Sequence, residues 1–214
     1  MTNFIPIFPL PLVVFPGEKV NLHIFEPRYK QLINECVKLG KPFGIPPVIK
    51  EKVSEMGTLV TVTEISHTYE DGRMDIKTEG REVFRILEII KELPEKLYSG
   101  AIVNYPENNT SGTKKDLMKA ILHGIRSIYN KLEVQKEFTK PDSEIVSYDI
   151  AHHMGLSLED EYRLLGLMNE NQRQEFLKRH LARVVPIMKE MEALRKKIKL
   201  NGHFKNLEGF NFSS

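Results

Sequence analysis

Hydrophobic residues near the start of the chain come in short, proline-punctuated runs that are typical of strands and turns. Residues 4–10 form one apolar run, and a turn at Pro16 separates it from a second extended segment. Pro27 then occupies the first position of a helix, where its missing N–H removes no hydrogen bond. The order predicted for this segment is strand, turn, strand and helix, with the helix over residues 27–39 ended by Gly40.

The chain continues to Val103 with β-branched or alternating runs that are separated by turn signals. Asp71-Gly72 is a hairpin signal, because this pair tolerates the positive φ that a tight turn requires. Gly80-Arg81 interrupts the alternation of apolar and polar residues and predicts a break between two strands. The strands predicted in this region cover residues 58–63, 74–79, 83–90 and 98–103. Several short strands with one inserted helix predict a small, strongly curved sheet.

The period of the hydrophobic pattern changes after a polar segment that is rich in turn residues. Apolar residues then recur at spacings of three and four, which predicts helices. The first of these helices covers residues 117–132, and a second begins at Asp142 or Ser143 and ends at Gly155. A short third helix is capped by Ser157, which lies three residues before Asp160.

A long last helix is predicted from Asn171 onward, with a kink at Pro186. Its apolar residues lie close to a heptad seam, which is compatible with packing on the preceding helices or with a dimeric coiled coil. Packing on the chain's own core is the preferred interpretation, and a homodimer is left open. The seam residues are Leu177, Leu181, Val184, Met188, Met191 and Ile198.

The predicted fold class is α+β, with an N-terminal β pseudo-barrel that contains one inserted helix and a C-terminal helical bundle that contains a long last helix. The predicted division is a β domain at residues 1–105, a linker at 106–113, a helical bundle at 114–200 and a tail at 201–214. Three aromatic residues in the last stretch are unusual for a chain end. They are expected to fold back between the two halves, and the alternative is a short peptide offered to a partner.

Composition describes an ordinary globular chain and excludes several classes of protein. Hydrophobic residues make up 41% and charged residues 28% of the 214 positions, which argues against disorder and against a membrane span. The 31 basic and 29 acidic residues give a formal charge of +2, too little to hold nucleic acid or an anionic membrane without a local patch. Prolines interrupt the first apolar run, which argues against a signal peptide, so a cytoplasmic location is expected.

Cysteine and histidine residues give little sign of reactive chemistry. Cys36 is the only cysteine, which fits a reducing compartment, and it falls on the apolar face of the first helix, where a small buried side chain is expected. His152 and His153 are adjacent on a predicted helix and diverge by about 100°, so they cannot readily share one ion. We expect no metal and no cofactor.

Several segments together resemble the N-terminal substrate-recognition domain of Lon proteases, in the variety that occurs as a separate protein. They are Phe8-Pro9-Leu10, Phe15-Pro16-Gly17, Leu22-His23-Ile24-Phe25-Glu26-Pro27-Arg28-Tyr29, Asp71-Gly72-Arg73 and Val83-Phe84-Arg85-Ile86. The resemblance implies a PUA-like β fold followed by a helical bundle. A complete Lon protease also needs a nucleotide-binding loop that ends in Gly-Lys-Ser or Gly-Lys-Thr, and the nearest sequence here is Gly40-Lys41-Pro42.

The resemblance implies a function in binding other polypeptides without catalysis. Glu26, Arg28 and Gln31 would then border the recognition face, at the start of the first helix. The expected partners are unfolded or partly folded polypeptides, and a protease or a chaperone is a further candidate. Four aromatic residues are expected in the core rather than in contact with a partner: Phe15, Phe25, Tyr29 and Phe84.

An RNA-binding PUA-like module is the alternative function. Residues 195–199 are locally basic, as a nucleic-acid site requires. The β half lacks the interleaved aromatic and basic residues of a base-stacking platform, so nucleic acid is the less favoured partner.

Overall fold

The structure is a computed structural model that describes residues 2–204, except for the side chains of residues 189, 192, 195, 196 and 198–204. The aromatic tail for which a fold-back was predicted lies largely outside the described residues. Most of the basic run at residues 195–199 also has side chains outside them.

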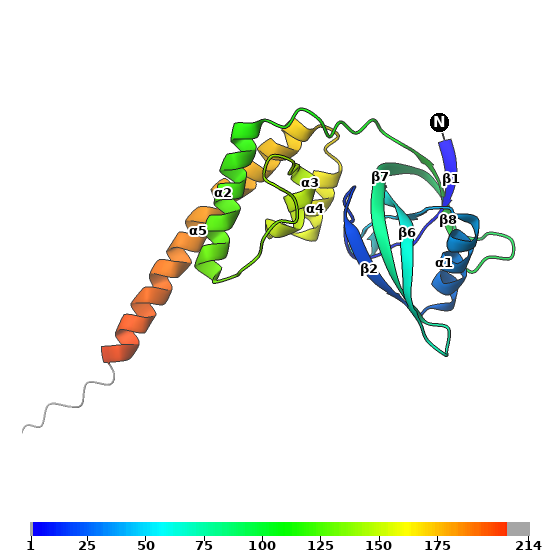
Figure 1. Cartoon of the computed structure of the whole chain (residues 1–214), viewed down its shortest axis with the longest axis horizontal. Coiled ribbons are helices and arrows are strands. Elements are labelled where there is room, and N and C mark those ends of the chain that lie inside the picture. The colour runs from blue at the N-terminus through cyan, green and yellow to red at the C-terminus, as the bar shows by residue number, and fades with distance from the viewer. Residues whose placement is uncertain (1, 205–214) are drawn as a thin grey trace, which may run out of the picture.

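A mixed but mostly antiparallel arrangement of strands forms the N-terminal part (Figure 1). The strands are β1 (Thr2–Pro6), β2 (Lys19–Ile24), β3 (Phe43–Ile45), β4 (Val48–Ile49), β5 (Lys52–Val53), β6 (Met56–Thr68), β7 (Met74–Ile90) and β8 (Gly100–Asn104). The main sheet has the order β1-β8-β7-β6-β3, and β2 pairs with the first part of β7. The mostly antiparallel sheet together with its helices confirms the mixed α and β character of the predicted α+β class.

The main sheet curves until its two ends meet. The chain after β1 runs beside β3, with parallel bridges from Ile7 to Gly44 and from Leu10 to Pro47. The inserted helix α1 (Pro27–Leu39) places its apolar face on the sheet, where Leu32 and Ile33 are fully buried. Gly40 ends α1 with φ of 62°, as predicted, because this left-handed conformation is unstrained for glycine.

One strand, β7, replaces the two strands predicted at residues 74–79 and 83–90, so the predicted break at Gly80-Arg81 is wrong. Gly80 stays in the strand and exchanges backbone hydrogen bonds with Gly17 and Glu18. A Cβ atom at Gly80 would overlap the carbonyl oxygen of Phe15. The glycine therefore marks the close approach of a second backbone, which is the other common reason for glycine inside a strand.

Helices form the C-terminal part of the described chain. They are α2 (Lys115–Leu132), α3 (Ser147–Ile150) with a following 3₁₀ turn at Ala151–His153, α4 (Leu158–Leu165) and α5 (Glu170–Phe204). The Ser157 hydroxyl caps α4 by accepting a hydrogen bond from the Asp160 N–H at 3.2 Å, as predicted. The long helix predicted from Asp142 to Gly155 is wrong, because Asp142 makes a bidentate pair with Arg126 of α2 at 2.6 and 2.8 Å.

The two parts share one of the hydrophobic clusters of the molecule. Val13, Phe15, Met56 and Val83 from the β part pack in the same buried cluster as residues of α2, α3, α4 and α5. The Tyr162 hydroxyl of α4 also accepts a hydrogen bond from the backbone N–H of Met56 at 3.3 Å. The helical part therefore covers one end of β6 and the adjoining part of β7.

The last helix α5 begins in the core and then extends away from the other helices (Figure 1). Leu177 and Leu181 are buried, whereas Met191 is exposed, so only the first part of the predicted seam lies in the core. The helix continues through Pro186, and a kink there stays a prediction. None of the helices in the described part of the chain has the length and apolar character needed to cross a membrane.

Candidate functional site

The start of α1 presents an aromatic side chain and an ion pair on the surface of the β part. Pro27 fixes the first turn after the extended residue Glu26, and Phe25 immediately precedes that residue. Arg28 Nε lies 2.8 Å from Glu26 Oε2, and the guanidinium stacks 4.6 Å from the ring centre of Tyr29. Phe25 is 59% exposed, so its predicted place in the core is wrong. The predictions of buried Phe15, Tyr29 and Phe84 are confirmed.

Gln31 lies one turn further along α1, where its amide group is used to hold a loop. Its Nε2 donates to the Glu95 carbonyl oxygen at 3.0 Å, and its Oε1 accepts from the Leu97 N–H at 2.8 Å. The structure thus brings Glu26 and Arg28 together and directs Gln31 to the loop between β7 and β8. Gln31 therefore holds the loop between β7 and β8 against α1.

The same loop is fixed to α1 a second time through Glu35. The Glu35 carboxylate accepts hydrogen bonds from Lys96 Nζ at 2.8 Å and from the Tyr98 hydroxyl at 2.7 Å. These two hydrogen bonds lower the pKa of Glu35, and burial together with the Glu35 contact raises the pKa of Tyr98. On the other side of α1, Lys30 Nζ donates to the Asp71 carbonyl oxygen at 3.0 Å. The helix is therefore held between two loops in a fixed position.

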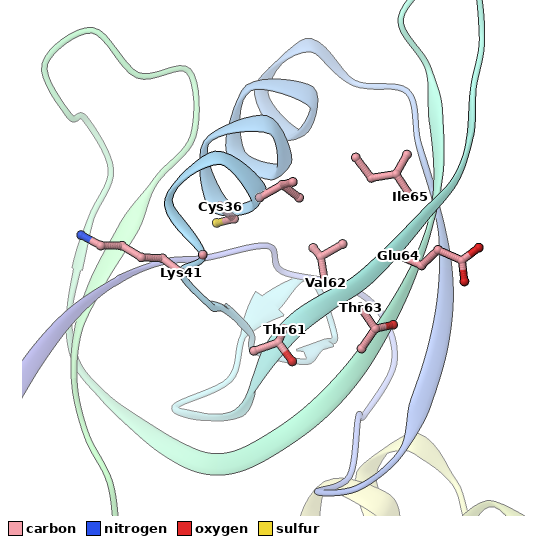
Figure 2. Close-up of a pocket in the computed structure, with 9 residues that line it drawn as sticks. Cys36, Lys41, Thr61, Val62, Thr63, Glu64 and Ile65 are labelled. Carbon is pink, nitrogen blue, oxygen red and sulfur yellow. The ribbon is translucent and has the colours of Figure 1, made fainter.

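A groove of about 280 Å³ lies between the C-terminal half of α1 and β6 (Figure 2). It is lined by Cys36, Val37, Gly40 and Lys41 and by residues 61–65 of β6. The side chains of Val62 and Ile65 point toward α1, whereas those of Thr61 and Thr63 point away from it (Figure 2). The groove can thus accept apolar side chains beside a strand.

Cys36 contributes a neutral thiol to this groove. Burial, followed by the nearby carboxylate of Glu35, raises the pKa of Cys36 to about 11. A thiolate is the reactive form of cysteine, so this side chain is a poor nucleophile at neutral pH. The prediction that Cys36 is a small buried side chain is confirmed.

Sequence reasoning did not find the groove, although it found both elements that form it. The predicted strand at residues 58–63 ended too early, and the short partner strand β3 was not predicted at all. The continuation of β6 through Ile65 to Thr68 depends on its long pairing with β7. The alternation of apolar Val62 with polar Thr63 was the one local signal in the sequence that β6 presents an apolar face to α1.

A buried polar cluster around Arg173 fixes the segment that joins the two parts. Arg173 and Glu170 have completely buried side chains, and the Arg173 Nε lies 3.1 Å from Glu170 Oε2. The remaining guanidinium hydrogens are donated to Asn108 Oδ1, the Leu167 and Asn109 carbonyl oxygens and the Tyr148 hydroxyl, over distances of 2.6 to 3.2 Å. Every partner is local to the junction, which indicates a structural role.

The two adjacent histidines point to different partners, as their helical geometry predicts. His152 lies between Glu161 at 2.7 Å and Glu18 at 3.2 Å, so it connects α4 with the turn before β2. His153 instead contacts the Tyr129 hydroxyl of α2 at 2.6 Å. Within residues 2–204, as far as side chains are described, no group of three or more His, Cys, Asp or Glu residues has a geometry suited to a metal ion.

Residues 5–183 match the family described as the ATP-dependent protease La (LON) substrate-binding domain. The chain belongs to this family. The match includes the β part, the groove and the helices as far as the middle of α5, so the resemblance inferred from the first helix and its flanking segments is confirmed.

Two solved structures of Lon N-terminal domains share the fold of this chain. A Lon N-terminal domain protein from Xanthomonas campestris is 21% identical with a TM-score of 0.62, and the alignment covers 82% of this chain and 96% of that one. The N-terminal domain of a Mycobacterium avium complex Lon protease is 13% identical with a TM-score of 0.63, over 84% and 98% of the two chains. A Lon protease of Amoebophilus asiaticus is 24% identical over 89% of this chain, which spans 24% of the length of that relative.

Proposed function

We propose that this chain is a non-catalytic module that binds unfolded or partly folded polypeptides. The observation that carries the proposal is the match of residues 5–183 to a substrate-binding family. The site geometry supports it, because the exposed surface of the β part offers an aromatic side chain, an ion pair and a groove with apolar side chains among its lining residues. Such features accept polypeptides with little demand on their sequence.

The recognition face proposed here begins at the start of α1. Phe25 would bind apolar side chains, and the ion pair of Glu26 with Arg28 would contact the polar backbone of a client. Gln31 supports this face by holding the loop between β7 and β8. The division into a β domain (1–105), a linker (106–113), a helical bundle (114–200) and a tail (201–214) is kept in the proposal, with recognition assigned to the β domain.

Location in the cytoplasm, a homodimer and cooperation with a protease or chaperone extend the same proposal. Each is compatible with a binding module that has no chemistry of its own. RNA binding is the alternative, and it is separated from polypeptide binding by the steep weakening with salt that phosphate contacts produce.

The experiment that tests the proposal measures binding of a permanently unfolded protein, such as reduced and carboxymethylated lactalbumin, by fluorescence anisotropy. We expect saturable binding that weakens several-fold for the Phe25→Ser variant. The matched control is Leu132→Ser on α2, which removes a similarly exposed apolar side chain far from α1. Absence of binding, together with a small ligand that raises the melting temperature, would contradict the proposal.

A further inference from the structure

The strand β6 has a free edge beside the groove. On one side β6 pairs with β7 from Met56 to Thr68, but on the other side β3 pairs only with Thr58, Leu59 and Val60. From residue 61 onward this second side has no strand partner among the described residues. An unpaired edge presents backbone N–H and C=O groups that can form a ladder with another chain.

The backbone of residues 61–65 is also free of other partners on this side. The hydrogen bonds of these side chains run to β7: Thr63 Oγ1 donates to the Lys77 carbonyl oxygen at 3.0 Å, and Lys77 Nζ donates to Glu64 at 2.8 Å. No loop or side chain within the described part of the chain bonds to the backbone of residues 61–65. This edge also lacks lysine and proline, the residues that commonly block an edge.

The groove lies along this edge of β6, next to the short segment that connects α1 with β3. Gly40 and Lys41 line the groove, and two residues further on Phe43 begins the pairing of β3 with Val60. The path beside residues 61–65 is therefore the continuation of β3, with α1 on one face. We propose that an extended segment of a client polypeptide occupies this path and pairs antiparallel with β6.

The side chains around the groove set the character of the client segment. Client side chains that point toward α1 would be apolar, because Val37 of α1 and Val62 and Ile65 of β6 line that side of the groove. Lys41 stands where the added strand meets β3, and neither Lys41 nor Lys38 forms an ion pair within the described residues, whereas Glu64 is neutralised by Lys77. The local charge is positive, so an acidic residue is favoured at the C-terminal end of the segment.

The added strand is short. A β-bulge interrupts the pairing of β6 with β7 between Val62 and Glu64, and a second follows between Ile65 and His67. Bulges increase the twist of a strand and end its regular pairing, so the usable edge is limited to a few residues. A groove of about 280 Å³ has room for two or three apolar side chains, which fits that length.

The proposal rests on the proposed function and specifies how the client is bound. The probe is a fluorescent peptide, acetyl-Thr-Val-Thr-Val-Thr-Val-Asp-amide, and its matched control is the reversed sequence with the aspartate at the N-terminal end. A second control carries N-methyl groups on alternate residues, in both possible registers. N-methylation keeps the side chains and removes the backbone donors, so it weakens strand addition about tenfold but leaves a side-chain contact unchanged.

Variants of the full chain locate the binding. Val37→Asp places a charge in the groove, and Leu39→Asp places the same charge on the exposed side of α1 outside it. We expect binding to weaken about tenfold for Val37→Asp and to stay unchanged for Leu39→Asp. In the Lys41→Glu variant, a peptide whose terminal aspartate is replaced by lysine should bind more tightly than the aspartate-terminated peptide. The Lys38→Glu variant should keep the preference for aspartate.

The outcomes separate this proposal from the proposed function. If unfolded lactalbumin binds but neither Val37→Asp nor N-methylation matters, strand addition is wrong and polypeptide binding stands. If lactalbumin does not bind, the proposed function itself fails. Strand addition is also overturned if the peptide binds only after removal of residues 205–214, or if Val37→Asp abolishes a dimer of the chain, because the groove then holds another occupant.

Discussion

The two ends of β6 differ in strand pairing and in burial. At the closed end, residues 56–60, the strand pairs with β7, β3 pairs with residues 58–60 on the other side, and all five residues are buried. At the open end, residues 61–68, only β7 pairs with the strand; residues 61 and 62 are half-buried and residues 63–68 are exposed. The helical part covers the closed end and leaves the open end uncovered. Stability is therefore concentrated at one end of a strand whose other end is available for binding.

The largest expected effect comes from a cavity at the closed end. Phe84 is completely buried, and its ring lies against Gly44 and Gly57, which have no side chains to fill the space that truncation leaves. The Phe84→Ala variant should lower the free energy of unfolding by about 3 to 5 kcal/mol. Urea unfolding followed by circular dichroism measures this loss. Leu87→Ala, at an exposed position of the same strand β7, is the control. An equal loss of stability in the two variants would show that stability is not concentrated around the closed end of β6.

The next effect tests whether the polar junction keeps the helical part in place. Arg173→Met leaves the buried Glu170 carboxylate without its cation, and breaking such a pair is strongly destabilising. Glu170 retains hydrogen bonds from the N–H and hydroxyl of Ser147 at 2.9 and 2.8 Å. We therefore expect a loss of about 3 kcal/mol, at the lower end of the usual range. Full stability of Arg173→Met in urea unfolding would show that the pair contributes little.

Burial of aromatic residues at the closed end and the limits of α1 were more predictable from the sequence than the geometry of the open end. Phe15 and Phe84 lie in the short apolar runs at residues 13–15 and 83–84, and such runs indicate burial from the sequence alone. The helix at residues 27–39 carried its own start and stop signals in Pro27 and Gly40. These features are set by residues that are close together in the chain, so they can be recognised from the sequence alone.

The open end depends on contacts between segments far apart in the chain. Where β3 stops pairing with β6 is set by the path from Gly40 to Phe43, and no pattern within β6 records it. The same limit explains why Phe25 was assigned to the core, since its exposure follows from the position of α1 on the sheet. Asp142 was assigned to a helix cap because its partner Arg126, on another helix, could not be known.

A smaller effect concerns pH at the contact between the two parts. Partial burial lowers the pKa of His152, but hydrogen bonds from its ring to Glu161 and Glu18 outweigh burial and raise the pKa to about 10. The folded pKa lies above the ordinary value of 6.5, so the stabilisation is complete below about pH 6.5 and is lost as pH rises through 10. The ring is partly exposed, which limits the effect to about 1 kcal/mol or less.

Urea unfolding of the wild-type chain and of His152→Gln between pH 6 and pH 10 measures this effect. The difference in stability between the two proteins should shrink toward the alkaline end, because only the wild-type chain loses a charged histidine there. A difference that is constant with pH would show that His152 stabilises the contact by packing alone, for example through its ring contact with Phe15 at 5.0 Å.

The smallest expected change in stability is at the open end itself. Ile65 is 38% exposed and lines the groove, so Ile65→Ala should lower the free energy of unfolding by only about 0.5 kcal/mol. Binding of the aspartate-terminated peptide should nevertheless weaken several-fold, because the methyl groups removed lie where the client's apolar side chains would pack. Leu59→Ala at the closed end should do the reverse, with a large loss of stability and unchanged affinity of the folded fraction. If Ile65→Ala changes stability and binding by equal free energies, the open end is a structural part of the sheet rather than an edge kept for a partner.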